Sequence, residues 1–392
     1  MNGGRKRPPS VAGCCPGGGG PSGPVRRRLV FTRAVVTNVD DDTPQNPNQE
    51  GPWELPHGLH VRKCIINSDG EYTHYCVQAR DLQDMVSLGD FVKTVPAANN
   101  LAPATLIRLR DPLQRLIDMV GLDAVKRSMF ELVVYYLQRL NSLEGDLLHT
   151  AVFGAPGVGK TMLIGILAEV YAALGVIRSD GPVVHARRTD LIGGYLGQTA
   201  IKTNEVIKSA AGGILVIDEA YSLGQEEGGR DIYATECVNT LNQALTEQRA
   251  SFVCIIAGYK ESIEQNFFRI NPGLERRFTQ RFEIPNCDAS SLARIFRAKV
   301  VAAGWILDGP TVGSDTFWTE HKKYFTFNGG DVETFFARVR MAHAVRVYST
   351  PRRDKRRVTQ ADFDTGFSTF CAVENVKKRG EVDDGALAHM YL

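Results

Sequence analysis

Short, nearly uninterrupted apolar runs alternate with helix-periodic segments through the middle of the chain. Such runs are typical of parallel strands that are buried on both faces. They predict strands at 149–153, 182–186, 213–217, 251–257 and 281–284. Apolar residues recur at helical spacing between these runs, and they predict helices at 162–174, 199–210 and 231–247. Thr199 is expected to cap the second of these helices. This alternation predicts a doubly wound parallel sheet, an α/β fold, within a core domain that spans residues 98–285.

Beyond residue 285 the pattern becomes helical only, which predicts an α-helical subdomain over residues 286–392. We predict one helix over 290–303 and a second that begins at Asp331. The segment 358–363 has the composition of a helix start and predicts a final helix.

The N-terminal residues differ in composition from the rest of the chain. Residues 1–29 are mostly glycine, proline and arginine, which predicts a disordered tail. Its two basic clusters, 5–7 and 26–28, fit a nuclear localisation signal, a contact with an anionic partner or a solvated tail. Residues 30–97 predict a small β-rich or irregular extension, with strand-like runs at 30–36, 60–66 and 72–77 and a linker at 96–100.

Composition and charge narrow the class of protein. The chain has 392 residues with 43% hydrophobic and 23% charged residues, as expected for a soluble protein of two or three domains. A net charge of +2 gives no general argument for nucleic acid or membrane binding. The eight cysteines lack metal-ligand spacing, and no apolar signal-peptide region is visible. These features predict a soluble, intracellular protein, cytoplasmic unless the basic tail directs it to the nucleus.

The strongest local motif joins the first predicted core strand to the helix that follows it. It reads G-x-x-x-x-G-K-T, the phosphate-cradling P-loop. Lys160 would reach the β- and γ-phosphates, and the Thr161 hydroxyl would ligate Mg²⁺. A chance glycine loop is the alternative, but the flanking strand and helix are the context that the motif requires. The predicted nucleotide-binding residues are Gly154, Ala155, Pro156, Gly157, Val158, Gly159, Lys160, Thr161 and Met162.

A second motif ends the apolar run at 213–217 with two carboxylates, Asp218 and Glu219. Ligands of α/β folds bind at the carboxyl ends of the strands. Asp218 is suited to hold Mg²⁺, and Glu219 to polarise an attacking water molecule. The alternative is a pair of carboxylates that merely end a strand. Together with the P-loop, the pair predicts ATP hydrolysis that depends on Mg²⁺.

From residue 110 to about 365 the chain resembles the AAA+ ATPases. It is most similar to the group that contains stage V sporulation protein K and the red-type rubisco activase. The resemblance rests on the segments 154–161, 191–200, 213–221, 257–260 and 271–274, in this order. It implies a five-stranded αβα ATPase core with an α-helical lid, and a ring, usually a hexamer, with ATP between subunits. Val120 and Gly121 match the family's adenine-contacting linker.

The resemblance also assigns roles outside the P-loop. Arg277, or its neighbour Arg276, matches the arginine finger that reaches the γ-phosphate of the next subunit. Tyr195, Leu196 and Gly197 match the aromatic pore loop of ring translocases. Without the family, the arginines would read equally well as a solvated surface pair. The alternative for Tyr195 is that it is a core residue buried beneath the loop.

The chain departs from the family pattern at two positions. The strand at 251–257 is followed by Gly258 and Tyr259 where many members have a polar sensor residue, so the resemblance passes that role to Tyr259. The helix expected at Asp331 has no arginine in its first turn, and Arg338 is the nearest substitute for the lid's sensor arginine.

These observations favour an ATP-driven machine that remodels or threads a protein substrate. A nucleic-acid motor or loader on the same fold is the alternative, which the basic tail would serve. The aromatic loop favours a protein client, and the chain shows no recognised DNA-binding module. A nucleotide-binding scaffold without hydrolysis is disfavoured by Lys160, Asp218 and Glu219.

Overall fold

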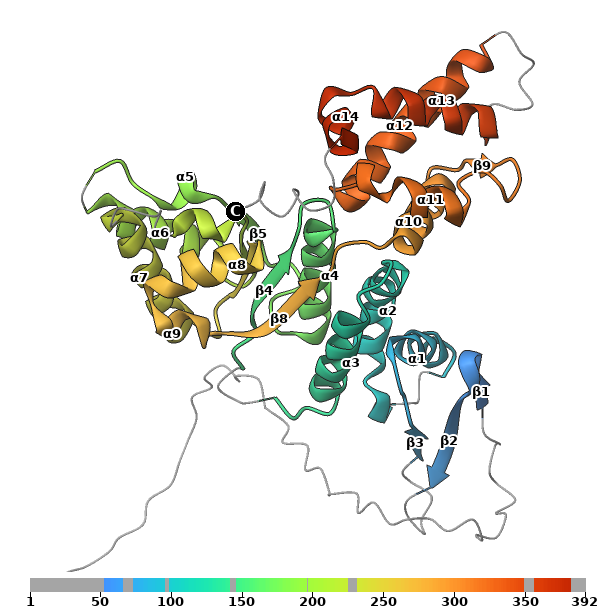
Figure 1. The fold of residues 1–392 in the computed structure, drawn as a ribbon. Coiled ribbons are helices and arrows are strands. Elements are labelled where there is room, and N and C mark those ends of the chain that lie inside the picture. Colours follow the sequence, from blue (N-terminus) through green and yellow to red (C-terminus); the bar gives the residue numbers. More distant parts are fainter. Residues whose placement is uncertain are drawn as a thin grey trace, which may run out of the picture. The chain divides into compact units, whose positions relative to one another are not determined.

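Five parallel strands form the central sheet of the computed structural model, which describes residues 53–65, 73–95, 99–141, 146–195, 197–224, 231–348 and 356–381 (Figure 1). The strands lie in the order β5-β6-β7-β4-β8. Their bounds are β4 His149–Gly154, β5 Val183–Ala186, β6 Ile214–Ile217, β7 Val253–Gly258 and β8 Phe278–Ile284. Each of the five was predicted from its apolar run, although β8 begins earlier than expected. The predicted tail at 1–29 and the predicted strand at 30–36 lie outside the described residues.

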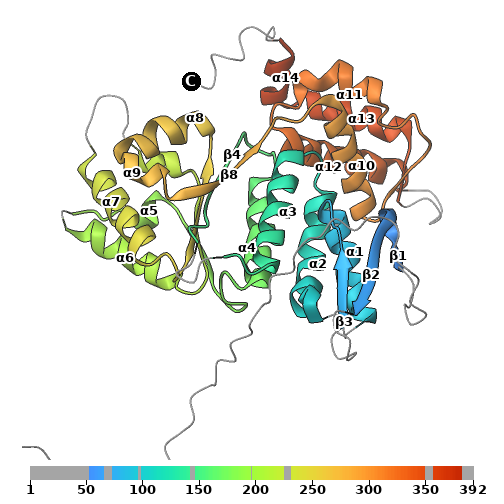
Figure 2. The same ribbon diagram turned by 90° about the horizontal axis from the view of Figure 1, so that it is seen from below.

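Side chains that alternate along the strands face two different hydrophobic cores. Val152, Val216 and Ile255 belong to the core beneath α2 Pro103–Asp118, α3 Asp123–Leu137 and α4 Lys160–Leu174. Phe153, Leu215 and Ile256 belong to the core beneath α6 Gln198–Ser209 and α7 Ile232–Glu247. Figure 2 shows the two helical layers on opposite sides of the sheet. This burial on both faces explains why the strands are continuous apolar runs and confirms the αβα sandwich.

Residues beyond the last strand form a separate helical subdomain, as predicted for the lid. It comprises α10 Ala289–Ala302, α11 Asp315–His321, α12 Asn328–Arg346, α13 Gln360–Cys371 and α14 Glu374–Glu381, with the short parallel pair β9 Ile306–Leu307 and β10 Arg357–Val358. Its core is rich in aromatic side chains, among them Phe296, Trp318, Phe335, Phe363 and Phe370. Helix α12 begins at Asn328 rather than at Asp331. Asp331 is instead buried, where it accepts hydrogen bonds from the Phe327 N–H and from Arg379 of α14, each at 2.7 Å.

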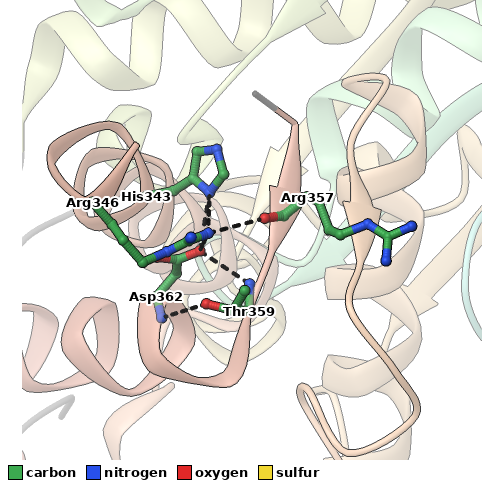
Figure 3. Close-up of polar contacts among 5 residues, drawn as sticks. All are labelled: His343, Arg346, Arg357, Thr359 and Asp362. Carbon is green, nitrogen blue, oxygen red and sulfur yellow. Dashed lines mark hydrogen bonds and ion pairs between the residues drawn. The ribbon is translucent and has the colours of Figure 1, made fainter. Parts of the chain in front are cut away.

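A buried polar cluster joins α12 to α13 (Figure 3). The Asp362 carboxylate contacts His343 Nδ1 at 2.9 Å and accepts from Arg346 Nε at 2.6 Å and from the Thr359 N–H at 3.0 Å. Burial alone would raise the pKa of Asp362, but the hydrogen bonds from Arg346, Thr359 and His343 outweigh it and hold this pKa well below its usual range. Thr359 also caps α13.

The segment before the core contains more helix than the sequence analysis predicted. Strands β1 Trp53–Leu55, β2 Leu59–Ile65 and β3 Thr73–Val77 form an antiparallel sheet. Helix α1 Leu82–Thr94 follows and packs against α2. Its N-cap is Asp81, whose side chain accepts the Asp84 N–H at 3.0 Å. The hydrophobic core beneath α2 and α3 therefore contains residues from both sides of the domain boundary that was predicted between 97 and 98.

The remaining short α-helices of the described residues are α5 Arg188–Leu191, α8 Lys260–Ser262 and α9 Pro272–Glu275. Within the described residues, no helix is both long and apolar enough to span a bilayer.

Candidate active site

A cavity of about 470 Å³ lies at the carboxyl end of the sheet. It is bounded by the P-loop, by the ends of β6 and β7, by the segment before α3 and by the lid. These parts meet because the carboxyl ends of parallel strands share one edge of a sheet, where α/β folds bind ligands. The residues that line it are Met119, Val120, Gly121, Leu122, Pro156, Gly157, Val158, Gly159, Lys160, Thr161, Met162, Asp218, Glu219, Tyr221, Gly258, Tyr259, Ile284, Pro285, Asn286, Cys287, Ser291, Ile295, Lys299, Gly329, Gly330 and Glu333.

The P-loop has the backbone that its glycines predict. Gly157 and Gly159 have φ values of 73° and 101°, a region that residues with side chains rarely adopt. A Cβ at Gly157 would also lie 2.0 Å from the carbonyl oxygen of Phe327, because the lid backbone packs directly on the loop. Helix α4 then begins at Lys160 without a side-chain cap. The N–H groups in the first turn of a helix lack intrahelical partners, which favours an anion at this point.

Lys160 lies with its ammonium group inside the loop. Its Nζ donates to the carbonyl oxygens of Gly154 at 2.8 Å and Ala155 at 2.9 Å. Burial lowers the pKa of this ammonium, and the charges of Asp218 and Glu219 oppose that shift. Gly154 and Ala155 therefore contribute carbonyl groups to Lys160 rather than lining the cavity, whereas the other predicted P-loop residues line it.

Asp218 and Glu219 lie where β6 ends, on the same cavity as Lys160 and Thr161. Glu219 has φ 52° and ψ 44°, a left-handed conformation that is strained for a residue with a side chain. Its N–H donates to Asp218 Oδ1 at 3.0 Å. Strain of this kind occurs often at active sites, where surrounding structure holds a side chain in place.

Two tyrosines flank the carboxylates. The rings of Tyr221 and Tyr259 lie 5.9 Å apart, and Lys160 Nζ lies 5.8 Å from the centroid of Tyr259. Burial and the nearby Glu219 charge raise the pKa of Tyr221. Tyr259 was predicted to take part in the site, but Tyr221 was not, although its position two residues after Glu219 in the sequence could have indicated it.

The segment before α3 reaches the cavity through Val120 and Gly121, as predicted. Lys126 holds this segment, because its Nζ donates to the carbonyl oxygens of Ile117 at 2.9 Å and Met119 at 2.7 Å. Burial lowers the pKa of Lys126. This positioning residue was missed, since a single lysine on a helix carries no sequence signal.

Comparisons with known proteins place this chain in a family. Residues 150–286 match the model of the ATPase family associated with various cellular activities (AAA). The putative cfxQ-like protein R730 of Acanthamoeba polyphaga mimivirus is 34% identical over 342 residues, which are 84% of this chain and 84% of that protein. The chain belongs to the AAA family of ATPases. It binds and hydrolyses ATP.

Two further relatives have functional names. The ribulose bisphosphate carboxylase/oxygenase activase of Cyanidioschyzon merolae is 35% identical over 61% of this AAA ATPase and 80% of the relative. Stage V sporulation protein K of Bacillus subtilis is 32% identical over 49% of this chain and 60% of that protein. The group that the sequence motifs resemble is therefore confirmed.

The lid of this AAA ATPase meets the P-loop through Asn328. Its Oδ1 accepts the Cys287 N–H at 2.7 Å, and its Nδ2 donates to the carbonyl of Pro156 at 3.4 Å and to Asn286 Oδ1 at 3.3 Å. Asn328 is 3% exposed and has φ 51°, which asparagine tolerates better than most residues. It was missed because its partners lie far apart in the sequence.

Arg338, the expected substitute for the lid's sensor arginine, does not line the cavity. Lys299 of α10 and Glu333 of α12 line it instead, with Lys299 Nζ 3.0 Å from Glu333 Oε2. The first turn of α12 presents Gly329 and Gly330 to the P-loop, next to the Asn328 side chain that contacts Pro156.

Arg276 and Arg277 lie outside the cavity lining, after α9. The side chain of Arg277 makes hydrogen bonds within its own chain. Its Nε donates to Thr246 Oγ1 at 2.8 Å, and its guanidinium also donates to the carbonyl oxygen of Gly273. Arg276 is exposed, and among the contacts of the described residues its side chain makes no hydrogen bond or ion pair, although its N–H donates to the Leu274 carbonyl. The fold therefore brings neither arginine to Lys160 of the same chain and leaves Arg276 free to reach outward.

The loop after α5 presents Tyr195 to solvent, with 74% of the residue exposed, so the core alternative for this residue is wrong. Gly197 has φ 83° and precedes α6, and Leu196 lies outside the described residues. Thr199, expected to cap this helix, is instead buried within its first turn, where its hydroxyl accepts the Gly193 N–H at 3.1 Å. That bond anchors the base of the loop beneath Tyr195.

Proposed function

We propose that this AAA ATPase assembles as a ring, most simply a hexamer, and uses Mg²⁺-dependent ATP hydrolysis to remodel or thread a protein substrate. The observation that carries the proposal is that two features lie apart on the ATPase core. Lys160, Asp218 and Glu219 meet in the cavity, whereas Tyr195 is exposed on a glycine-flanked loop outside it. A hydrolysis site and a separate aromatic contact are what an ATP-driven machine needs.

The residues of the cavity supply the chemistry. Lys160 neutralises phosphate charge, and Glu219 accepts the proton of the attacking water as that water is polarised. Thr161 and Asp218 offer a hydroxyl and a carboxylate, the hard oxygen ligands that suit Mg²⁺ when phosphates and water complete its shell. When bound, Mg²⁺ neutralises charge on the phosphate oxygens.

The position of the arginines supports ring assembly. We assign the arginine finger to Arg276, with Arg277 as its alternative. Arg276 has a free guanidinium at the surface, and the hydrogen bonds of Arg277 to Thr246 and Gly273 fit a role in holding α9. A finger supplied to the next subunit couples hydrolysis to assembly, because the active site is then incomplete in a single chain.

A protein client is supported by the exposed Tyr195. An aromatic ring gives a sequence-tolerant grip on a polypeptide, and the flanking glycines let the loop move. The name of one relative, ribulose bisphosphate carboxylase/oxygenase activase, refers to action on a protein. We do not transfer that client to this chain, because the fold does not fix the substrate.

The test is polymer-dependent turnover. The ATPase rate of the full chain would be measured with an unfolded polypeptide, with single- and double-stranded DNA, and with RNA. Stimulation by the polypeptide alone supports the proposal. Stimulation by nucleic acid alone overturns it in favour of a nucleic-acid motor or loader. A Glu219→Gln variant, which should hold ATP and client together, would then serve to capture the client.

A further inference from the structure

The last described helix of the lid, α14, is held in place by few side chains (Figure 1). Among residues 374–379, whose side chains the structure describes, Val376 is buried in the lid core and the Arg379 side chain is 13% exposed, whereas the other four residues are exposed. A helix of eight residues has little stability of its own. The position of α14 on the lid therefore depends strongly on Arg379.

The Arg379 guanidinium lies against the start of α12. Its Nη1 donates to Asp331 Oδ2 at 2.7 Å and to the carbonyl oxygen of Tyr324 at 3.0 Å. Its Cζ lies 4.5 Å from the centroid of the Phe327 ring, a distance suited to a cation–π contact. One side chain of α14 thus contacts three residues around the first turn of α12.

Asp331 carries this contact to the backbone. The carboxylate oxygen that binds Arg379 also accepts the Phe327 N–H at 2.7 Å. The Asp331 side chain is 9% exposed, and burial raises its pKa, while the hydrogen bonds from Phe327 and Arg379 oppose that shift. Removal of one partner of a buried ion pair leaves the other charge uncompensated. Without Arg379, the carboxylate would therefore hold the turn at 327–331 less firmly.

The turn that this carboxylate holds is a part of the lid that packs on the P-loop. A Cβ at Gly157 would lie 2.0 Å from the carbonyl oxygen of Phe327, and a Cβ at Gly329 would lie 3.0 Å from the carbonyl oxygen of Gly157. Asn328, between Phe327 and Gly329, donates to the Pro156 carbonyl. Since Gly157 lines the nucleotide cavity, a displacement of this turn changes the support of the phosphate-binding loop.

We propose that Arg379 is a positioning residue for nucleotide binding, which holds the turn at 327–331 against the P-loop and so links the docking of α14 to the affinity for ATP. Arg379 does not line the cavity, so it acts only through this turn. Such linkage is reciprocal, and ATP binding therefore favours docked α14 by the same factor. The proposal rests on the nucleotide site at Lys160. Its competitor is that Arg379 only fastens α14 to the lid.

Steady-state ATPase kinetics test the effect of Arg379 on the nucleotide site. Arg379→Gln should raise the KM for ATP about tenfold, as expected when a hydrogen bond to a charged group is lost, and should leave kcat within about threefold. Arg379→Lys keeps the charge and should recover part of the affinity. Lys378→Gln is the matched control on the same helix, because its ion pair with Glu374 is exposed, and it should behave as wild type. A wild-type KM in folded Arg379→Gln, with only a lower melting temperature, would establish the competitor and overturn the proposal.

A double-mutant cycle tests the route through Asp331. Asp331→Asn should also weaken ATP binding, and adding Arg379→Gln to it should weaken binding no further, because both residues act through one contact. Additive losses would show that Arg379 does not act through Asp331 and would overturn the proposed route.

Amide hydrogen exchange tests the reverse direction and gives an answer even if Arg379→Gln does not fold. Saturating ATP, added to Glu219→Gln to prevent turnover, should slow exchange in α14, with α7 on the other face of the sheet as the internal reference. Unchanged exchange in α14 would overturn the proposal. Lys160→Ala tests the site itself: wild-type ATP affinity there refutes the nucleotide site, whereas lost affinity there with a wild-type KM in Arg379→Gln refutes only the role of Arg379.

Discussion

The side-chain amide of Asn328, the first residue of α12, donates a hydrogen bond to the carbonyl oxygen of Pro156 in the P-loop at 3.4 Å. The same side chain accepts the Cys287 N–H at 2.7 Å, in the segment that joins the core to the lid. One buried residue therefore contacts the nucleotide loop, the interdomain segment and the lid. A change in the P-loop can be transmitted to the lid through it.

Asn328→Gly should loosen this connection without straining the backbone, because glycine adopts the observed φ of 51° readily. Loss of the buried hydrogen bonds should destabilise the protein by about 1–3 kcal/mol. We also expect the KM for ATP to rise several-fold, since the P-loop loses its support. Thermal melting and ATPase kinetics measure the two effects. Asn286→Ala, which removes only the 3.3 Å contact, is the matched control. Reduced stability with unchanged kinetics would limit Asn328 to a structural role.

Glu219→Gln should keep ATP binding and lower turnover by at least about 100-fold, because the amide cannot act as a general base. The isosteric change leaves Asp218 in place. Equilibrium titration with ATP and steady-state hydrolysis provide the two readouts. Asp218→Asn serves as the comparison and should instead raise the Mg²⁺ concentration that hydrolysis requires. Loss of ATP binding in Glu219→Gln would point to a structural role for this carboxylate.

Arg276→Ala should lower hydrolysis by about 10³-fold with ATP binding intact, as expected for loss of an arginine finger. Arg277→Ala should instead lower the free energy of unfolding by about 1 kcal/mol, because its hydrogen bonds to Thr246 and Gly273 are lost. Mixing Arg276→Ala with Lys160→Ala subunits should restore part of the activity at shared interfaces. If only Arg277→Ala abolishes hydrolysis, the finger is Arg277. Mixtures without any rescue would argue against a site between subunits.

Tyr195→Ala should leave basal hydrolysis within a few-fold and abolish the work done on a client. The exposed ring makes no core contact, so the melting temperature should not change. A buried aromatic residue would instead lose about 3–5 kcal/mol of stability on truncation to Ala. Client-stimulated turnover and client remodelling are the measurements. Tyr195→Phe keeps the ring face and should be tolerated. Unimpaired remodelling by Tyr195→Ala would refute the pore-loop assignment.

Asp362 should make the lid sensitive to acid. Its hydrogen bonds from Arg346 and His343 place its folded-state pKa below the unfolded value of about 4. The stabilisation is therefore present above about pH 4 and is lost as the pH falls through and below that value toward the folded pKa. Asp362→Asn should destabilise the protein at neutral pH and flatten the acid limb of its stability curve. Urea unfolding of both proteins from about pH 3 to 7 measures this, and parallel curves would exclude Asp362 as the cause.

The parts of the site that the sequence predicted are those that lie in continuous segments. The P-loop, Asp218 and Glu219 each follow an apolar strand directly, so strand periodicity and local chemistry were enough to place them. The linker at Val120 and Gly121 and the exposed Tyr195 needed the family resemblance. Thr199 was misassigned because a threonine near a helix start resembles a cap, whereas tertiary packing buries it against the loop base.

The missed residues act through contacts that are distant in sequence. Asn328 meets Pro156 across 172 positions, and Lys299 meets Glu333 across 34. No local pattern encodes such pairs. Helix α1 was a different omission: Asp81 caps it, and Met85, Leu88 and Phe91 follow at helical spacing, so its signal was present in the sequence.

The aromatic core of the lid has a mechanical consequence. Ring contacts such as Phe296 with Phe335 and Phe335 with Phe363 fill the space between α10, α12 and α13, and close-packed interiors resist deformation. Helix α12 has 19 residues and so extends about 28 Å from Asn328. If α12 rotates slightly at its P-loop end, the whole helix should therefore rotate by the same angle. The opposite end, where Val345 and Tyr348 are exposed, should then move furthest. The lid would act as a stiff lever, converting a displacement the size of one phosphate contact into a larger movement at its tip.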